Sequence, residues 1–258
     1  MAVVTRWSAV LLAGSRPRGH PKASSLLMGH KALIEVGGMP MVLRPLKALL
    51  DSPEIDRVAV MAQDIEPLRN VVPNDPRLSL KPSRETIART IQALVADDSA
   101  HFPMLVTTAD HALLSPAMIA QFCSAAADAD LAIGVVESAG LLARFPQARR
   151  TWIGFKGGRY SGANLFAFGS AKVAGAVDRW SVVEQERKKG WRLLFALGPS
   201  VLLGALFKLR SIEQTAAAIG GKLGMSIRIV QLSDPLAAID VDKPADLELV
   251  EAILAGTA

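Results

Sequence analysis

Three acidic residues occupy positions where a chain of alternating strands and helices would bring them to a ligand site. Asp110 ends the stretch TTAD, directly after the apolar run MLV, while Asp240 and Asp242 alternate in IDVDKPADL. A buried carboxylate needs a compensating positive charge, and Mg²⁺ binds one or two carboxylates together with substrate phosphates. These residues are therefore candidates for a magnesium site. The alternative is that Asp110 caps a turn and that Asp240 and Asp242 lead into the turn before Pro244.

A glycine-containing loop follows the first apolar run of the chain. The stretch LLAGSRPRG places Gly14 and Gly19 around Arg16 and Arg18. Glycines let the backbone approach a ligand closely, and successive backbone N–H groups in such a loop can converge on phosphate oxygens. The loop lacks the Lys-Ser/Thr continuation of a P-loop and the G-x-G-x-x-G pattern of dinucleotide sites. Alone, it fits a phosphate-binding loop or an ordinary turn.

The elements that would position these residues alternate along the first half of the chain. Four apolar runs are typical of buried strands: SAVLLAG, DRVAVMA, PMLVTTAD and LAIGVVES. Between them, RETIARTIQALVAD and PAMIAQFCSAAADA have helical spacing, with Ser83 and Ser115 as predicted N-caps and Pro116 at the first helical position. The alternation predicts an α/β protein with three α/β/α layers around a mostly parallel mixed sheet.

The pattern changes after Glu137. The stretch RTWIGFKGGRYSGANLFAFG predicts a hairpin that turns at Gly157-Gly158. Helices are expected over about 170–223, with a capping box at SIEQ, followed by the strand SIRIVQL. The chain then ends in a strand around IDVD and a helix opened by Pro244. Because no linker is evident, we expect one domain over residues 1–258 with a helical insertion at about 170–223.

Composition limits the choice of partners and compartment. The net charge is +5 and the pI is near 9.6, which favours anionic partners or reflects a basic solvated surface. Cys123 is the only cysteine, which excludes an intrachain disulfide and fits a reducing cytoplasm. The 15-residue stretch LLFALGPSVLLGALF contains Pro199 and falls short of the roughly 20 apolar residues that a membrane span needs.

Four segments together resemble a known family. The segments LLAGSRPRG, HKALIEVGGMPMV, TTAD and IDVDKPADLELVEAIL occur in the order seen in nucleotidyltransferases with the GT-A type nucleotide-binding fold. The chain resembles the MobA-like NTP transferases, which are related to molybdenum cofactor guanylyltransferase, the cytidylyltransferases and the sugar-phosphate nucleotidyltransferases. The resemblance runs nearly end to end.

The resemblance implies that an NTP reacts with a phosphorylated small molecule or lipid head group and releases pyrophosphate. By analogy with the related enzymes, the NTP is expected to be CTP or GTP. It implies that Arg16, Lys31 and Asp110 are catalytic and that Mg²⁺ is held by Asp110 with Asp242 or Asp240. The nucleotide would contact these residues: Leu12, Ala13, Gly14, Ser15, Arg16, Lys31, Ser83 and Thr86. The acceptor would meet Arg159, Tyr160 and Asn164 in GRYSGANLFAF.

The phosphate-binding lysine has two candidates. Lys22 follows Gly19 at the spacing that is usual in the family, whereas Lys31 precedes the usual continuation ALIEVGGMPMV. We favour Lys31, with residues 18–28 as an enlarged loop.

Two alternatives to a nucleotidyltransferase stay open at this point. A GT-A glycosyltransferase would use an Asp-x-Asp motif, but DVD at Asp240 to Asp242 stands at the wrong end of the chain. A non-catalytic nucleotide-binding or membrane-peripheral module would use residues 187–210, which mix basic and apolar side chains as an interfacial helix does. The same segment could be a buried helical pair. Few Tyr and Trp residues and no recognised motif argue against a nucleic-acid partner.

Overall fold

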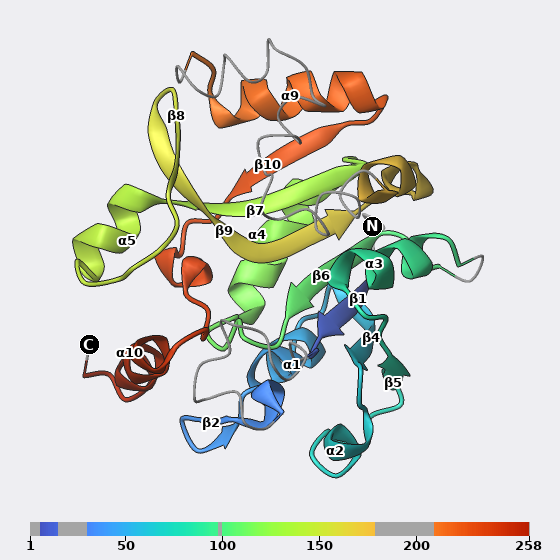
Figure 1. The fold of residues 1–258 in the computed structure, drawn as a ribbon, viewed down its shortest axis with the longest axis vertical. Coiled ribbons are helices and arrows are strands. Elements are labelled where there is room, and N and C mark those ends of the chain that lie inside the picture. The colour runs from blue at the N-terminus through green and yellow to red at the C-terminus, as the bar shows by residue number, and fades with distance from the viewer. Residues whose placement is uncertain (1–5, 15–29, 98–99, 179–208, 258) are drawn as a thin grey trace.

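A mixed sheet of eight strands runs through the molecule (Figure 1). The computed structural model describes residues 6–97, 100–178 and 209–257, apart from 15–29. The order across the sheet is β10-β7-β9-β6-β1-β4-β5, with β8 paired to β9. The strands are β1 (Trp7–Leu12), β4 (Ile55–Ala62), β5 (Leu78–Pro82), β6 (Met104–Thr108), β7 (Leu131–Glu137), β8 (Ile153–Phe155), β9 (Gly158–Phe168) and β10 (Ile227–Gln231).

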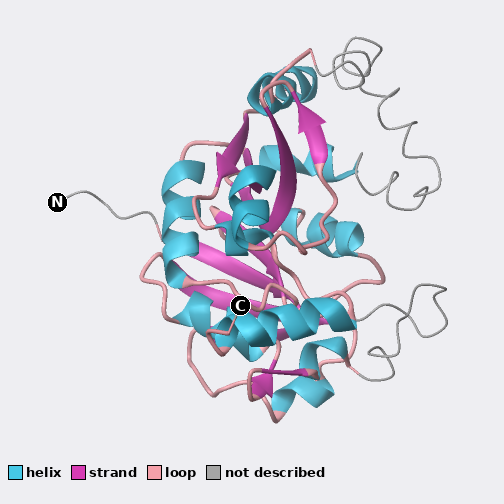
Figure 2. Cartoon of the chain, turned by 90° about the vertical axis from the view of Figure 1, so that its left-hand side faces the viewer, coloured by secondary structure: helices cyan, strands magenta, loops and turns pink. Residues whose placement is uncertain are grey.

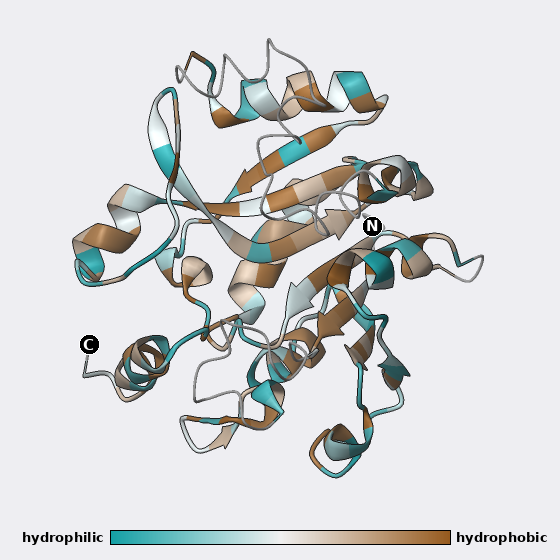
Figure 3. Cartoon of the chain, in the orientation of Figure 1, coloured by the Kyte–Doolittle hydropathy of each residue, from teal (hydrophilic) through white to brown (hydrophobic). Residues whose placement is uncertain are grey.

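The four predicted strands of the first half are confirmed as β1, β4, β6 and β7. Strands β5, β4, β1 and β6 run parallel to one another, and Leu11 lies between Val60 of β4 and Thr107 of β6. Because both faces of a parallel sheet are covered, the inner strands β1, β4 and β6 are largely apolar. Figure 3 shows β1, β4 and β6 as largely hydrophobic.

Helices cover both faces of the sheet (Figure 2). Helix α1 (Leu43–Leu50) and helix α4 (Pro116–Ala126) pack with Leu11 in one buried cluster. Helix α3 (Ile87–Val95) packs with Val10 in a second cluster. Adjacent residues of β1 thus enter opposite cores, as the alternation of side chains along a strand requires. The layering agrees with the predicted α/β/α arrangement.

Strand β9 is the antiparallel member of the sheet, because it pairs antiparallel with β6, β7 and β8. The predicted hairpin between β8 and β9 is confirmed. Its turn lies at Lys156–Gly157, one residue earlier than predicted, since Phe155 pairs with Gly158. Gly157 has φ +96°, a conformation that glycine adopts without strain.

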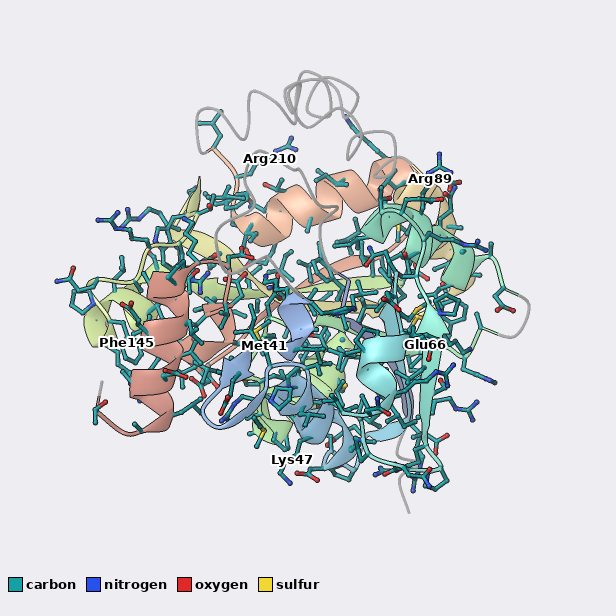
Figure 4. The ribbon with its side chains drawn as sticks, turned by 60° about the horizontal axis from the view of Figure 1, so that its bottom comes forward. Met41, Lys47, Glu66, Arg89, Phe145 and Arg210 are labelled. Atoms are coloured by element: carbon teal, nitrogen blue, oxygen red, sulfur yellow. The ribbon has the colours of Figure 1, made fainter. Side chains whose placement is uncertain are left out.

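The other elements are short helices, a small hairpin and two longer helices. They are the 3₁₀-helices η2 (Lys31–Leu33), η3 (Ala171–Val173) and η5 (Pro235–Ala238), the strands β2 (Glu35–Val36) and β3 (Met39–Pro40), and the helices α2 (Glu66–Arg69), α5 (Ser138–Arg144), α9 (Ile212–Leu223) and α10 (Pro244–Leu254). Figure 4 shows Met41, which is fully buried, in the interior and Lys47 at the surface.

Two of the three predicted N-caps are confirmed. Ser115 caps α4 by accepting a hydrogen bond from Met118 N, and Ser211 and Gln214 form a capping box on α9. The third start was placed three residues too early, because Thr86, not Ser83, caps α3. Ser83 N donates to Ala62 O, the last residue of β4, so Ser83 still belongs to the sheet edge.

The predicted strand around IDVD is wrong. Asp234 caps the 3₁₀-helix η5, and residues 239–243 form a loop. Ile239 and Val241 are buried, which gives the strand-like pattern, but Val241 N makes a single bond to Asp110 O rather than joining a ladder. The helix opened by Pro244 is confirmed as α10.

The structure describes only the two ends of the predicted helical insertion. Helix α9 and the short η3 fall inside residues 170–223, whereas residues 179–208 are outside the described part of the chain. The apolar stretch Leu193–Phe207 and all of 187–210 except Leu209 and Arg210 are outside it too. Within the described residues, no helix combines the length and apolar character needed to cross a bilayer.

Candidate active site

The candidate site lies at the edge of the sheet where the parallel strands β1, β4 and β6 end. Ala13, just after β1, donates its N–H to Met61 O of β4, and Ala109, just after β6, donates to Leu12 O. These bonds extend the parallel pairing by one residue beyond the strands. They bring the start of the glycine loop at Gly14 next to the turn that carries Asp110. Ligands of open α/β sheets bind at this carboxyl edge.

Lys31 connects the two predicted metal ligands. Its Nζ lies 2.6 Å from Asp110 Oδ2 and 2.8 Å from Asp242 Oδ1. The Lys31 and Asp110 side chains are only 17% and 20% exposed, while that of Asp242 is 46% exposed. One ammonium group therefore joins a strand-end carboxylate with a carboxylate from the far end of the chain.

The electrostatic balance keeps Lys31 charged. Burial favours the neutral amine, but the Asp110 and Asp242 carboxylates outweigh it, so the pKa of Lys31 is above its ordinary value. The backbone around Lys31 is fixed as well, because Leu33 N donates to His30 O and Val42 N, at the start of α1, donates to Ala32 O. The short helix η2 thus holds a charged lysine at the sheet edge.

The two carboxylates are oriented by further hydrogen bonds. Thr108 Oγ1 donates to Asp110 Oδ1 at 2.5 Å, which leaves Oδ2 directed at Lys31. The loop of Asp242 is tied to Asp110 by the bond from Val241 N to Asp110 O, at 3.0 Å. Asp246, in the first turn of α10, accepts from the N–H groups of Asp242 and Lys243. The spatial proximity of Asp110 and Asp242 is therefore built into the backbone.

Asp240 has a different environment. Its carboxylate forms an ion pair with Arg150 and accepts a hydrogen bond from Asn164 Nδ2 at 3.1 Å. Arg150 Nη2 also donates to the backbone oxygen of Asp240 at 2.8 Å. Burial, followed by the nearby Asp110 and Asp242 charges, raises the pKa of Asp240, while Arg150 opposes this shift. Asp240 and Asp242 thus face different partners although only one residue separates them.

The predicted nucleotide-binding residues are described in part. Leu12 and Ala13 are buried at the end of β1, and Gly14 is exposed. A Cβ on Gly14 would lie 2.8 Å from the Gln63 side-chain amide, so the glycine makes room for Gln63. Ser15, Arg16 and Lys22 lie outside the described residues.

Ser83 and Thr86 lie at the same sheet edge as Gly14. Ser83 is bonded to the end of β4, and Thr86 Oγ1 accepts from Arg89 N to cap α3. The structure therefore brings both predicted residues to the edge. The hydroxyl of Thr86 has a structural role in the helix cap.

The predicted acceptor residues Arg159, Tyr160 and Asn164 all belong to β9. Tyr160 pairs with Glu137 at the end of β7, so this half of β9 reaches the same edge of the sheet as Asp110. Arg159 and Tyr160 are consecutive and point to opposite faces of the strand, so the structure does not bring their side chains together. Burial, followed by Glu137 and Glu213, raises the pKa of Tyr160.

Sequence reasoning missed several residues of this site. Arg150 belongs to no motif, and Thr108, Gln63 and Asp246 are ordinary polar residues in sequence. His111 directly follows Asp110, and that adjacency was the signal that could have found it. It is 1% exposed, and burial lowers its pKa to about 4. Among the described residues, neither ring nitrogen has a hydrogen-bond partner, so the imidazole is neutral at pH 7.

The donor set fits a hard divalent cation. Two carboxylates converge on one positive charge, and Mg²⁺ takes one or two carboxylates and completes its octahedron with water and phosphate oxygens. Within the part of the chain that the structure describes, no group of three or more His, Cys, Asp or Glu side chains could hold a metal by itself. Asp110 and Asp242 therefore suit a cation that also has phosphate ligands better than a cation whose ligands all come from the protein.

The sequence profile of the MobA-like NTP transferase domain matches residues 9–201. The chain belongs to this family. The match includes the glycine loop, Lys31, Asp110 and β9, and so covers most of the edge described above. This nucleotidyltransferase has no match among the curated proteins.

Solved structures share the fold of this chain. A hypothetical transferase from Thermus thermophilus is 26% identical, with a TM-score of 0.79 over 94% of this chain and 99% of that one. The 4-diphosphocytidyl-2C-methyl-D-erythritol synthase from Anaerococcus prevotii DSM 20548 is 15% identical, with a TM-score of 0.62 over 98% and 97% of the two chains.

A third structure, of CMP:2-keto-3-deoxy-manno-octonic acid synthetase complexed with CTP, is also 15% identical. Its TM-score is 0.62 over 98% of this chain and 100% of that one. At this identity the likeness concerns the fold, which is the GT-A type that the sequence predicts.

Proposed function

We propose that this nucleotidyltransferase transfers a nucleoside monophosphate from an NTP to a phosphorylated acceptor and releases pyrophosphate in an Mg²⁺-dependent reaction. The observation that carries the proposal is the position of Lys31 between Asp110 and Asp242 at the carboxyl edge of the sheet, where β1 ends just before Gly14. A cation and two carboxylates at this edge match a ligand that brings both phosphate charge and a metal.

The negatively and positively charged residues of the site have different proposed roles. Asp110 and Asp242 would hold Mg²⁺, which when bound offsets the negative charge of the triphosphate. Lys31 would then place its ammonium against the α-phosphate, where negative charge develops as the reaction proceeds. Thr108 and Asp246 keep the carboxylates oriented, so that little reorganisation is needed when the substrates arrive.

The bond changes need no general base. An oxygen of the acceptor phosphate forms a bond to the α-phosphorus, and the bond from that phosphorus to the bridging oxygen of the β-phosphate breaks. The electron pair leaves with pyrophosphate. Because the acceptor phosphate is already anionic at pH 7, no proton has to be removed from it. The protein contributes positioning and charge stabilisation, which dominate phosphoryl-type transfers.

The substrates are proposed by class. CTP and GTP are the nucleotides to test first, since the structures of similar fold include a 4-diphosphocytidyl compound synthase and a synthetase in complex with CTP, and the family is named for MobA. The acceptor is a phosphorylated alcohol, sugar or lipid head group. It would approach from the half of β9 that reaches this edge, where Tyr160 pairs with Glu137.

The test is a matrix of the four NTPs against phosphorylated alcohols, sugars and lipid head groups, with Mg²⁺, read out as pyrophosphate. We expect one pairing to release pyrophosphate only when both substrates are present, with a matching nucleotide-linked product by mass spectrometry. A protein that instead releases a nucleoside diphosphate from a nucleotide sugar would be a glycosyltransferase of the same fold. Asp130→Asn, at the opposite end of β7, is the control variant and should keep the activity.

A further inference from the structure

Asp240 lies where three separate segments meet. Arg150 reaches it from the loop that follows α5 and precedes β8, and Asn164 reaches it from the middle of β9. Asp240 itself belongs to the loop 239–243. Its neighbour Val241 is bonded to Asp110 O, and the next residue, Asp242, contacts Lys31. The acceptor side and the metal side of the site are therefore joined through one carboxylate.

Arg150 contacts Asp240 through two of its guanidinium nitrogens. One guanidinium nitrogen contacts the carboxylate and the other donates to the backbone oxygen of the same residue. The Arg150 side chain is 11% exposed and that of Asp240 is 22% exposed. Contacts to both side chain and main chain fix the position of the loop as well as the orientation of the carboxyl group. A planar guanidinium suits this paired contact, which a lysine could not reproduce.

The backbone of β9 is irregular where Asn164 contacts Asp240. Ile133 pairs with Phe166 and Val135 pairs with Gly162, so one residue of β7, Gly134, faces three residues of β9. Asn164 lies in this bulge with φ +49°, a left-handed conformation that Asn tolerates better than most residues. Bulges next to active sites redirect side chains, and this one directs the Asn164 amide at Asp240.

We propose that Asp240 is a positioning residue and not a metal ligand: through Arg150 and Asn164 it locks the β8–β9 hairpin, on the acceptor side, to the loop that carries Asp242. Both carboxylate oxygens are committed to protein donors, since Oδ1 faces Arg150 and Oδ2 faces Asn164. Asp242 contacts Lys31, as Asp110 does, and would be the metal ligand instead of Asp240. The kinetic consequences of this inference rest on the proposed function. The structural link, which is the contact of Asp240 with Arg150 and Asn164, does not depend on that function.

The link is tested first by unfolding in urea without substrates, with Asp240→Asn, Arg150→Gln and the double variant. Each single variant leaves a buried partner uncompensated, whereas the double variant removes both halves of the pair. We expect the free energy of unfolding of the double variant to be at least as high as that of the less stable single variant. Destabilisations that simply add would overturn the link, whatever the enzyme catalyses.

The second test separates positioning from metal binding in the active enzyme. We expect Asp242→Asn to raise the Mg²⁺ concentration for half-maximal activity by about 10-fold or more, a loss typical of perturbed metal sites. Asp240→Asn and Arg150→Gln should leave that concentration within about twofold, and instead lower kcat and raise the acceptor KM with little change in the NTP KM. A shift in the Mg²⁺ requirement of Asp240→Asn equal to that of Asp242→Asn would make Asp240 a ligand and sink the proposal.

A matched control distinguishes positioning from general loss of structure. Asp130, just before β7, is 16% exposed and accepts hydrogen bonds from Ser170 and Ser226, but it lies at the other end of the sheet. We expect Asp130→Asn to lower stability without changing the acceptor KM. If it raised the acceptor KM as much as Asp240→Asn, the kinetic effect would be a consequence of destabilisation and the proposal would fail. If no substrate pairing is turned over by the wild type, the proposed function fails and the urea cycle alone decides the link.

Discussion

The ammonium of Lys31 lies 2.6 Å from Asp110 Oδ2, although the two residues are 79 positions apart in the chain. The same ammonium contacts Asp242, which is 211 positions from Lys31. The ammonium therefore lies between two carboxylates, in a place that would also attract a divalent cation. If Mg²⁺ and an NTP were bound, Asp110 and Asp242 would hold the metal and Lys31 would contact the phosphates instead of the carboxylates.

The first prediction concerns the carboxylates. Asp110→Asn is expected to fold normally and to lose roughly 10²-fold in Mg²⁺-dependent turnover, because a neutral amide cannot offset the charge of the cation. Asp242→Asn should act likewise. The measurement is pyrophosphate release at saturating substrates, with Asp130→Asn as the folded control. Wild-type rates in Asp110→Asn would remove that residue from the site.

The second prediction concerns the exchange between lysine and metal. In Lys31→Ala, Asp110 and Asp242 lose the ammonium that joins them, so this ammonium no longer competes with the cation. Mg²⁺ should therefore raise the Tm of Lys31→Ala more than that of the wild type, since a ligand stabilises the state that it binds. Thermal melts with and without Mg²⁺ test this. An equal rise in both proteins would show that the metal binds elsewhere.

A third prediction follows for turnover. Lys31→Ala should lower the rate far more than Lys22→Ala, because only Lys31 is placed at the α-phosphate. Lys22 lies outside the described residues, so this comparison depends on the proposed mechanism. The reverse order of effects would assign the phosphate contact to Lys22.

The fourth prediction tests the close approach after β9. A Cβ on Gly169 would lie 2.0 Å from Ala129 O, a backbone atom, whereas a Cβ on Gly162 would meet nothing within 4 Å. Gly169→Ala should therefore lower the free energy of unfolding by about 1–3 kcal/mol, as overpacking does. Gly162→Ala should leave it nearly unchanged. Urea denaturation of both variants measures the difference, and equal stabilities would contradict the packing at this position.

The fifth prediction concerns Cys123, the only thiol in the chain. Burial, aided by Glu54, raises its pKa to about 12, so at pH 8 it is a neutral and inaccessible thiol. In the unfolded chain its pKa returns to about 8.5 and the thiolate becomes reactive. A thiol reagent at pH 8 should label the native protein very slowly and label one site quickly in denaturant. Fast labelling without denaturant would show that the α4 core opens.

How far the fold could be predicted from sequence depends on burial. Strands β1, β4, β6 and β7 were predictable because both of their faces are covered and most of their residues are apolar. The edge strand β5, LSLKP, is half exposed and carries no such pattern. The buried Ile239 and Val241 imitate a strand because a loop can bury alternate residues without forming a ladder. Alternating apolar residues indicate alternating burial, and a buried segment need not be a strand.

The site was predictable where residues follow a strand end and unpredictable where pairs form across the fold. Asp110 and the glycine loop were identified by their place after apolar runs. The pairing of Asp240 with Arg150 spans 90 positions and has no local signature. The choice between Asp240 and Asp242 could not be made from sequence, because alternate residues of a loop need not share a face.

The strand order has a consequence for synthesis of the chain. Within the described sheet, β7 is separated from β6 by β9, which begins only at Gly158, after β7 has ended at Glu137. As the chain emerges from the ribosome, β7 is complete before the strand that attaches it to the rest of the sheet exists. Its hydrophobic residues and unpaired edge groups are then exposed, which invites aggregation or chaperone binding. Pausing of translation between residues 137 and 158 would lengthen that exposure, and fast elongation there would shorten it.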